Sequence, residues 1–120
     1  MITLKTLADA TPQQVFDQIA THLIKQNSRC SLAKSDDLCR YREGDLKCAA
    51  GCLISNDEYS QDMETRTWSY LIDKGMVPIN SHTSLISRLQ QMHDDLDVED
   101  WGSVLKEIAY QFELNTDVLN

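Results

Sequence analysis

The 120-residue chain contains no uninterrupted apolar run of about 18 residues, the length that a membrane-spanning helix needs. Its first residues, MITLKTLADATPQQ, lack the apolar core and the small-residue cleavage site of a secretory signal peptide. We therefore expect a protein that does not enter the membrane and lies in the cytoplasm. In that reducing compartment its four cysteines are expected to be thiols or metal ligands rather than disulfides.

Motifs of common catalytic and nucleotide-binding sites are missing as well. The sequence has no HExxH, no GxSxG and no glycine-rich phosphate loop, and Gly44 in the stretch REGD is a single turn glycine. Its three histidines stand alone in the sequence, so the chain shows no nucleophile and base in a recognisable pattern. These absences favour a non-enzymatic protein.

Basic residues are also scarce, with 11 against 19 acidic ones and a net charge of −8. A phosphate backbone would be repelled on average, so direct binding to nucleic acid is not expected. The distribution is uneven, because residues 25–47 carry six basic residues against four acidic ones. A protein partner is the more natural target of such a chain.

The most acidic stretch is DDLDVED, residues 94–100. One interpretation is a solvated helix start, where carboxylates cap the helix and interact well with its dipole. The other is a surface suited to a basic protein partner, or one that imitates nucleic-acid phosphates. The candidate partner-binding residues are Asp94, Asp95, Asp97, Glu99 and Asp100.

Apolar residues recur with a helical period along most of the chain. A helix is predicted over residues 12–26, where Thr11 and Gln14 form a capping box around Pro12. Further helices are predicted around residues 68–72, across residues 83–96 and from a cap at Asp97 to about residue 112. We expect a mainly α, compact single-domain helical bundle over residues 1–120. An irregular cysteine-containing loop would follow the first helix, with room for one short hairpin around residues 38–41.

Three of the four cysteines lie in CRYREGDLKCAAGCLISNDEY, residues 39–59. Cys48 and Cys52 are four residues apart, so on a helix both sulfur atoms lie on one face and suit Zn²⁺, with Cys39 and Cys30 as further ligands. The spacing has one close pair where structural zinc sites usually have two. Packing of Cys48 and Cys52 as small core residues is therefore the first interpretation, and a zinc site on Cys39, Cys48 and Cys52 is the second.

A reactive thiol is the third interpretation, because cations and a helix N-terminus favour the thiolate. Cys39 is followed by Arg40, and the motif continues with Tyr41 and Arg42. Arg40, Tyr41 and Arg42 are therefore candidate residues for binding a small anionic ligand. Under this alternative the protein is a cysteine-based metal-binding or thiol-dependent protein.

The stretch CRYREGDLKCAAGCLISNDEY, followed by LISRLQQMHDD and an acidic residue before Trp101, resembles a group of small uncharacterised proteins of bacteria and their phages. The resemblance covers about half of the chain and implies a compact, mostly helical fold in a bacterial or phage setting. Together with the size, the charge and the missing catalytic motifs, it favours an acidic protein that binds another macromolecule. Inhibitor, immunity and counter-defence proteins are of this kind, and no cofactor is expected unless the cysteines bind zinc.

Overall fold

The predicted helix over residues 12–26 is present and lies at the centre of the fold. In the computed structural model, which describes residues 1–30 and 40–120, helix α1 spans Pro12–Gln26. The Thr11 hydroxyl accepts the N–H of Gln14, and the Gln14 side chain accepts the N–H of Thr11, so the capping box is confirmed. Helix α1 ends where Asn27 takes a left-handed conformation with φ of 51°.

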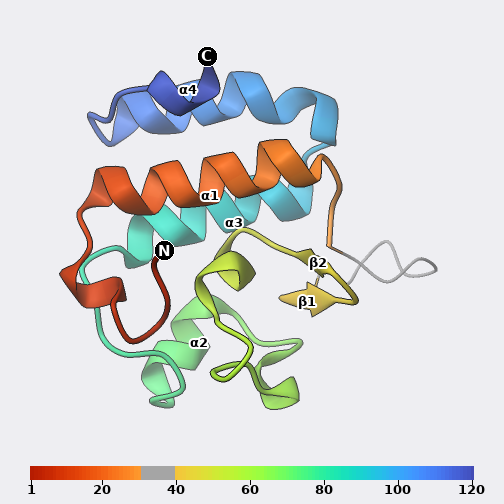
Figure 1. The fold of residues 1–120 in the computed structure, drawn as a ribbon, viewed down its shortest axis with the longest axis vertical. Coiled ribbons are helices and arrows are strands. Elements are labelled where there is room, and N and C mark those ends of the chain that lie inside the picture. The colour runs from red at the N-terminus through yellow and green to blue at the C-terminus, as the bar shows by residue number, and fades with distance from the viewer. Residues whose placement is uncertain (31–39) are drawn as a thin grey trace.

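Two further helices pack with α1 and complete the larger part of the bundle. Helix α3 spans Thr83–Asp95 and helix α4 spans Trp101–Gln111, and the chain reverses between them so that they lie antiparallel (Figure 1). The short helix α2, Trp68–Asp73, lies at the opposite end of the molecule from α4. The remaining helical turns are the 3-10 helices η1 Leu7–Asp9, η2 Ala50–Leu53, η3 Gln61–Met63, η4 Val98–Asp100 and η5 Asp117–Leu119. None of the described helices combines the length and the apolar character needed to cross a lipid bilayer.

The start of the last helix differs from the prediction. Asp97 precedes the 3-10 helix η4, and α4 begins only at Trp101. Neither Asp97 nor Asp100 makes a side-chain capping hydrogen bond. Asp97 thus occupies the N-cap position of η4, which runs directly into α4, but the expected capping hydrogen bond is wrong, and the α-helix itself begins one turn later than expected.

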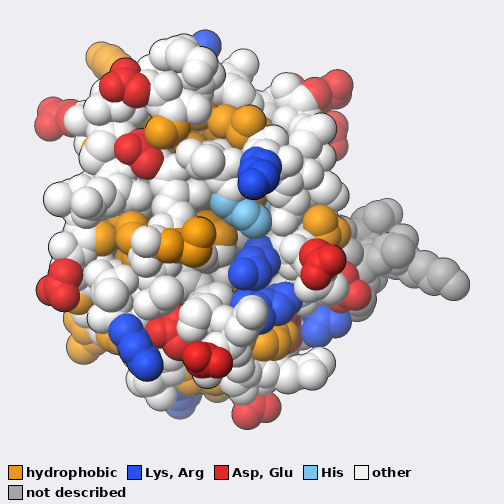
Figure 2. Space-filling view, viewed as in Figure 1, with side chains coloured by type: hydrophobic (Ala, Val, Ile, Leu, Met, Phe, Trp, Pro, Cys, Tyr) orange, Lys and Arg blue, Asp and Glu red, His pale blue; other side chains and the backbone are white. Residues whose placement is uncertain are grey.

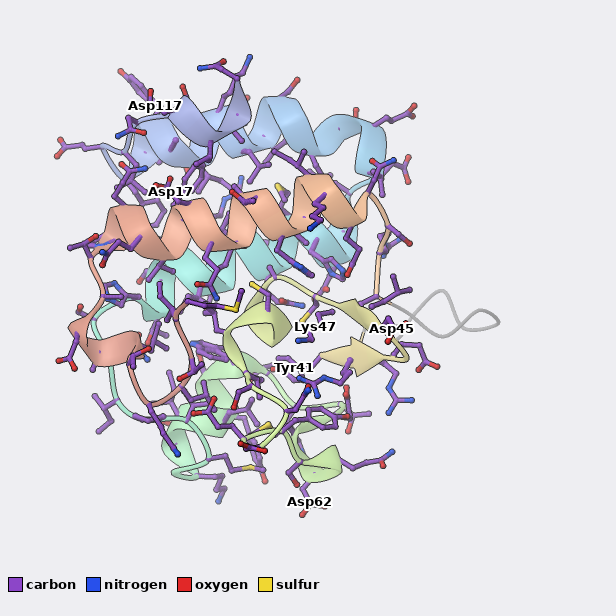
Figure 3. The ribbon with its side chains drawn as sticks, viewed as in Figure 1. Asp17, Tyr41, Asp45, Lys47, Asp62 and Asp117 are labelled. Carbon is purple, nitrogen blue, oxygen red and sulfur yellow. The ribbon has the colours of Figure 1, made fainter. Side chains whose placement is uncertain are left out.

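A two-stranded hairpin is present, and it lies later in the chain than expected. Strand β1, Arg42–Glu43, pairs antiparallel with β2, Leu46–Lys47, so that Arg42 faces Lys47 and Glu43 faces Leu46. Gly44, with φ of +59°, takes the left-handed conformation that the tight turn requires. Lys47 lies beside α1 and Asp45 at the outer turn (Figure 3). Of the stretch predicted to form a hairpin, residues 38 and 39 lie outside the described residues.

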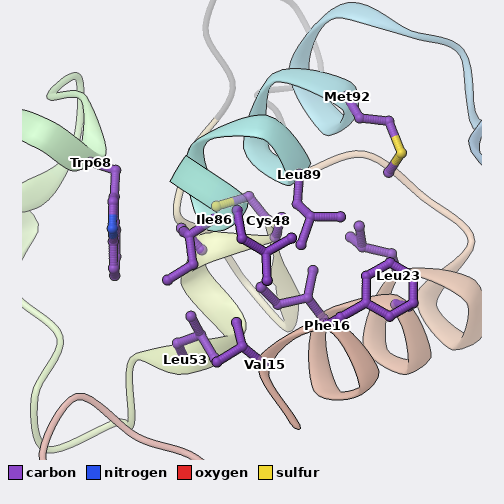
Figure 4. Close-up of a cluster of buried hydrophobic side chains, with 14 of the residues drawn as sticks. Val15, Phe16, Leu23, Cys48, Leu53, Trp68, Ile86, Leu89 and Met92 are labelled. Carbon is purple, nitrogen blue, oxygen red and sulfur yellow. The ribbon is translucent and has the colours of Figure 1, made fainter. Parts of the chain in front are cut away.

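The hydrophobic core lies between α1, α3 and the segment around η2. Phe16 and Leu23 from α1 meet Ile86 and Leu89 from α3, and the side chain of Cys48 lies among them (Figure 4). The apolar residues of α1 and α3 that recur with a helical period are buried, apart from Ile24, which is 46% exposed. The described residues thus form a mainly α single domain with a short hairpin.

Polar side chains satisfy the backbone of the irregular segments that have no helix or sheet of their own. The Gln26 side chain bonds both the N–H and the carbonyl of Lys47, and Gln90 accepts the N–H of Ala50. The carboxylate of Glu58 accepts the N–H groups of Leu4 and Lys5, more than fifty residues away in the chain. Buried N–H groups need acceptors, and in these segments the acceptors are side-chain oxygens instead of the carbonyls of a neighbouring strand.

Candidate functional site

The carboxylates of DDLDVED are divided between the interior and the surface. Asp94 is partly buried, and its carboxylate lies 2.8 Å from Nδ1 of His93 and 2.9 Å from the side-chain nitrogen of Gln90. Its backbone carbonyl also accepts a hydrogen bond from Arg29. Asp94 therefore stabilises the C-terminal end of α3 and differs in role from the other four acidic residues.

The remaining four carboxylates form a surface that we call the acidic corner, defined as Asp95, Asp97, Glu99 and Asp100. All four residues are exposed, and they surround the turn that joins α3 to α4. Within the described part of the chain, none of their side-chain oxygens takes part in a hydrogen bond or ion pair. Asp97, Glu99 and Asp100 lie at the helical start where the dipole favours negative charge, but among residues 1–30 and 40–120 no side-chain cap or salt bridge uses the four charges.

His93 and Cys30 are residue types that serve as base and nucleophile in enzymes. Here the imidazole bonds to the backbone of Cys30, and the thiol bonds elsewhere. His93 is fully buried, and its Nε2 accepts the backbone N–H of Cys30 at 3.0 Å. The Cys30 thiol donates instead to the carbonyl of Leu46 at 3.3 Å. With Nδ1 bonded to Asp94 and Nε2 occupied by a backbone donor, the imidazole is a bracing group between α3 and residue 30.

Cys48 precedes the 3-10 helix η2 and Cys52 lies within it, so the two are not on one face of an α-helix, and each sulfur bonds to the backbone three residues away. The Cys48 sulfur accepts the N–H of Gly51, whereas the Cys52 thiol donates to the carbonyl of Ala49. Burial raises the pKa of the Cys48 thiol well above its ordinary value, and it raises the pKa of Cys52 to about 12. Both groups are therefore protonated at neutral pH, which suits core packing better than nucleophilic chemistry.

The residues of the expected zinc site are only partly placed. Cys39 lies outside the described residues, so the structure places only Cys48 and Cys52 of the three expected zinc ligands. Among residues 1–30 and 40–120, no group of three or more histidine, cysteine, aspartate or glutamate side chains is arranged to hold a metal ion. The zinc site on Cys39, Cys48 and Cys52 therefore stays a prediction.

The three consecutive residues expected to bind an anion, Arg40, Tyr41 and Arg42, all contact one buried carboxylate, Glu64. Its oxygens accept the N–H groups of Tyr41 and Arg42 at 2.9 and 3.2 Å, and the hydroxyl of Tyr59 at 2.6 Å. Arg40 lies 3.8 Å from the same carboxylate and also pairs with Glu43. The negative charge of Glu64 thus balances the positive charge of Arg40, and its hydrogen bonds orient the backbone at the start of the hairpin.

Tyr41 faces inward, whereas Arg42 reaches the surface. The Tyr41 ring is buried and its hydroxyl donates to the carbonyl of Arg66 at 2.6 Å, an arrangement that braces the loop. Arg42 is half-buried, and its guanidinium lies 4.6 Å from the ring centre of Tyr59. The importance of Glu64 was missed at the sequence level, because an isolated glutamate in METRTW has no distinguishing spacing.

Comparison of the chain with protein-family models, with curated proteins and with solved structures found no match to any of them.

Proposed function

We propose that this protein is a non-enzymatic binding protein whose acidic corner contacts a basic surface of a protein partner. Its setting would be bacterial or phage, and its role that of an inhibitor, an immunity protein or a counter-defence protein. The observation that supports the proposal is the set of four exposed carboxylates that have no intramolecular partner among the described residues. Concentrated charge of one sign accelerates association with an oppositely charged surface and selects among partners.

The position of the acidic corner supports the same role. Three of its residues lie between the end of α3 and the start of α4, two helices whose buried faces meet in the core. A rigid pair of helices holds the joining turn in place, so the partner would meet charges that are already arranged. Little ordering would be needed on binding, and this lowers the entropic cost of association.

The experiment compares two tagged proteins that carry the same net charge. In the first, the acidic corner is neutralised by Asp95→Asn, Asp97→Asn, Glu99→Gln and Asp100→Asn. In the matched control, four exposed carboxylates outside the corner are neutralised by Asp9→Asn, Asp57→Asn, Asp62→Asn and Asp73→Asn. Each set removes four negative charges, so both variants differ equally from wild type in their long-range field.

Partners are captured from a bacterial lysate at low salt, identified by mass spectrometry, purified and titrated against all three proteins by calorimetry. Exposed ion pairs contribute about 0.2–1 kcal/mol each, so the loss of four should weaken binding of the corner variant by roughly fourfold or more relative to the control. The affinity of wild type should also fall with added salt. Equal affinities of the two variants for every purified partner would contradict the proposal.

A further inference from the structure

A second charged surface lies on the hairpin side of α1, and its sign is opposite to that of the acidic corner. We call it the basic strip and define it as His22, Lys25, Arg42 and Lys47. Figure 2 shows a histidine near the middle of one face with lysine and arginine side chains on either side of it. Among the three histidines, His22 is partly exposed, whereas His82 and His93 are buried.

Strand pairing places two of these cations on the same side of the hairpin. Arg42 and Lys47 are directly opposite each other in the ladder, whereas Glu43 is paired with Leu46. Successive side chains of a strand point to opposite faces, so Glu43 lies on the other face from Arg42 and Lys47. Like charges placed directly opposite each other destabilise a hairpin unless a counter-charge lies between them.

Within the described part of the chain, no carboxylate supplies that counter-charge. Glu43, the nearest acidic residue in the strand, pairs with Arg40 at 3.1 Å. The Arg42 guanidinium bonds only neutral oxygens, the side-chain oxygen of Asn56 at 2.8 Å and the carbonyl of Ile54 at 2.9 Å. The Lys47 ammonium takes part in no hydrogen bond or ion pair there.

His22 is held beside this pair in one orientation. Its Nε2 lies 2.9 Å from the carbonyl oxygen of Lys47, which can only accept, so Nε2 carries a proton. The other ring nitrogen, Nδ1, has no hydrogen-bond partner among the described residues. Gln26 fixes the Lys47 backbone from both sides, with hydrogen bonds of 2.8 and 2.9 Å. The imidazole, the guanidinium and the Lys47 backbone are therefore each held by hydrogen bonds, and the Lys47 ammonium extends from that fixed backbone.

We infer that the basic strip binds a phosphate dianion, either free or as a small phosphate monoester, between Arg42, Lys47 and His22. An arginine and a lysine supply charged donors that suit phosphate oxygens, and the fixed imidazole adds a third group that donates when it is protonated. Lys25, exposed one helical turn from His22, adds positive potential. This site is separate from the acidic corner and does not depend on the function proposed for it.

The protonation of His22 provides a direct readout. Burial lowers the pKa of His22, the hydrogen bond to the Lys47 carbonyl acts to raise it, and the positive charge of Lys47 lowers it, so that the pKa lies below its ordinary value. The other charged or titratable groups near the ring are Lys25 on the same helix and His93 on α3. A dianion bound next to the ring would oppose these effects and raise the pKa of His22.

The test is a titration of the full chain with inorganic phosphate and with adenosine monophosphate, followed by NMR of the histidine ring carbons at constant ionic strength set with sodium chloride. We expect saturable shifts of the His22 signals at millimolar ligand and a raised pKa of His22. Lys47→Gln removes the ammonium and leaves the backbone that Gln26 holds, so its fold should persist and its affinity should fall about tenfold. Lys106→Gln, an exposed lysine on α4, is the matched control and should bind as wild type does.

Several outcomes would overturn the proposal. Shifts that rise linearly without saturation would mean that phosphate acts only as bulk salt. Equal affinities of Lys47→Gln and Lys106→Gln would place any bound phosphate elsewhere. Binding of a single-stranded DNA without binding of inorganic phosphate or the mononucleotide would show an extended polyanion surface in place of the proposed site. If adenosine monophosphate binds and free phosphate does not, the ligand is the monoester, and the proposal is retained in that form.

Discussion

Replacing Gly51 with alanine should destabilise the fold strongly, because the backbone of another segment lies against the α-carbon of this glycine. A Cβ atom added at position 51 would lie 2.1 Å from the carbonyl oxygen of Tyr41 and 3.1 Å from its carbonyl carbon. It would also lie 3.3 Å from the Cys48 sulfur. An oxygen at 2.1 Å must move by about an ångström to reach an ordinary contact distance, and the residue that must move belongs to a backbone that is already fixed.

The cost follows from what the Tyr41 segment is bonded to. Its carbonyl accepts the N–H of Cys48 at 3.3 Å, and its N–H is bonded to Glu64. Overpacking in a close contact costs about 1–3 kcal/mol, and each strained or broken hydrogen bond adds about 1 kcal/mol. The total is about 3–5 kcal/mol, a large share of the 5–15 kcal/mol that is typical of folded domains.

Denaturant unfolding monitored by circular dichroism measures this loss, and Gly102→Ala is the matched control. Gly102 lies in α4 with no atom within 4 Å of an added Cβ, so alanine there should stabilise the helix by roughly 0.5–1 kcal/mol. The two alanine variants should therefore differ by about 4 kcal/mol or more in free energy of unfolding. A Gly51→Ala protein within 1 kcal/mol of wild type, by the same extrapolation, would refute the close-contact reasoning.

Glu64→Gln should destabilise the fold by about 2–4 kcal/mol, because an amide nitrogen would replace one of the oxygens that accept the Tyr41 N–H, the Arg42 N–H and the Tyr59 hydroxyl; unchanged unfolding at pH 7 would contradict this. Burial acts to raise the pKa of Glu58, yet hydrogen bonds from backbone N–H groups outweigh it and leave that pKa below its ordinary value of 4.5. Glu58 therefore contributes stability above about pH 4.5, and this contribution is lost as the pH falls through the lowered pKa. The difference in free energy of unfolding between wild type and Glu58→Gln should shrink in acid, and a difference that grows in acid would contradict the lowered pKa. Cys48→Ser should cost about 1–3 kcal/mol in thermal or denaturant unfolding, because a hydroxyl would enter an apolar contact; full stability with loss of partner binding would favour the thiol interpretation instead. Native mass spectrometry of protein purified without chelator tests the zinc alternative, for which one stoichiometric zinc that is lost in Cys48→Ser is the expected result.

The helices were the most predictable part of this protein, because their determinants are local. Thr11 and Gln14 are three residues apart, and their capping box depends on nothing outside that turn. The apolar stripe of α3 is equally local, since residues three and four apart share a helix face whatever they pack against. His93 lies four residues after Leu89 and so shares this buried face.

Long-range pairing could not be predicted in the same way. Glu64 accepts bonds from residues 41 and 42, and no local pattern distinguishes it from a solvated glutamate. The start of α4 was misplaced because Asp97 has the composition of a cap, while the extra turn of η4 depends on how α3 and α4 meet. For the candidate sites, the acidic run and the local excess of positive charge were visible in the sequence. The pairing of Arg42 with Lys47 and the position of His22 beside them required the fold.

The dependence of the irregular backbone on polar side chains changes where this protein can tolerate mutation. In most domains the apolar core is constrained and polar positions vary freely. Here backbone N–H groups of other segments are accepted by four polar side chains, those of Gln26, Glu58, Glu64 and Gln90. Replacing glutamate with glutamine there exchanges an acceptor for a donor, and replacing glutamine with glutamate adds an unpaired charge. A saturation-mutagenesis screen for folding should therefore find these four positions nearly as intolerant as Phe16. Exposed apolar residues such as Ile79 and Tyr110 should accept almost any replacement.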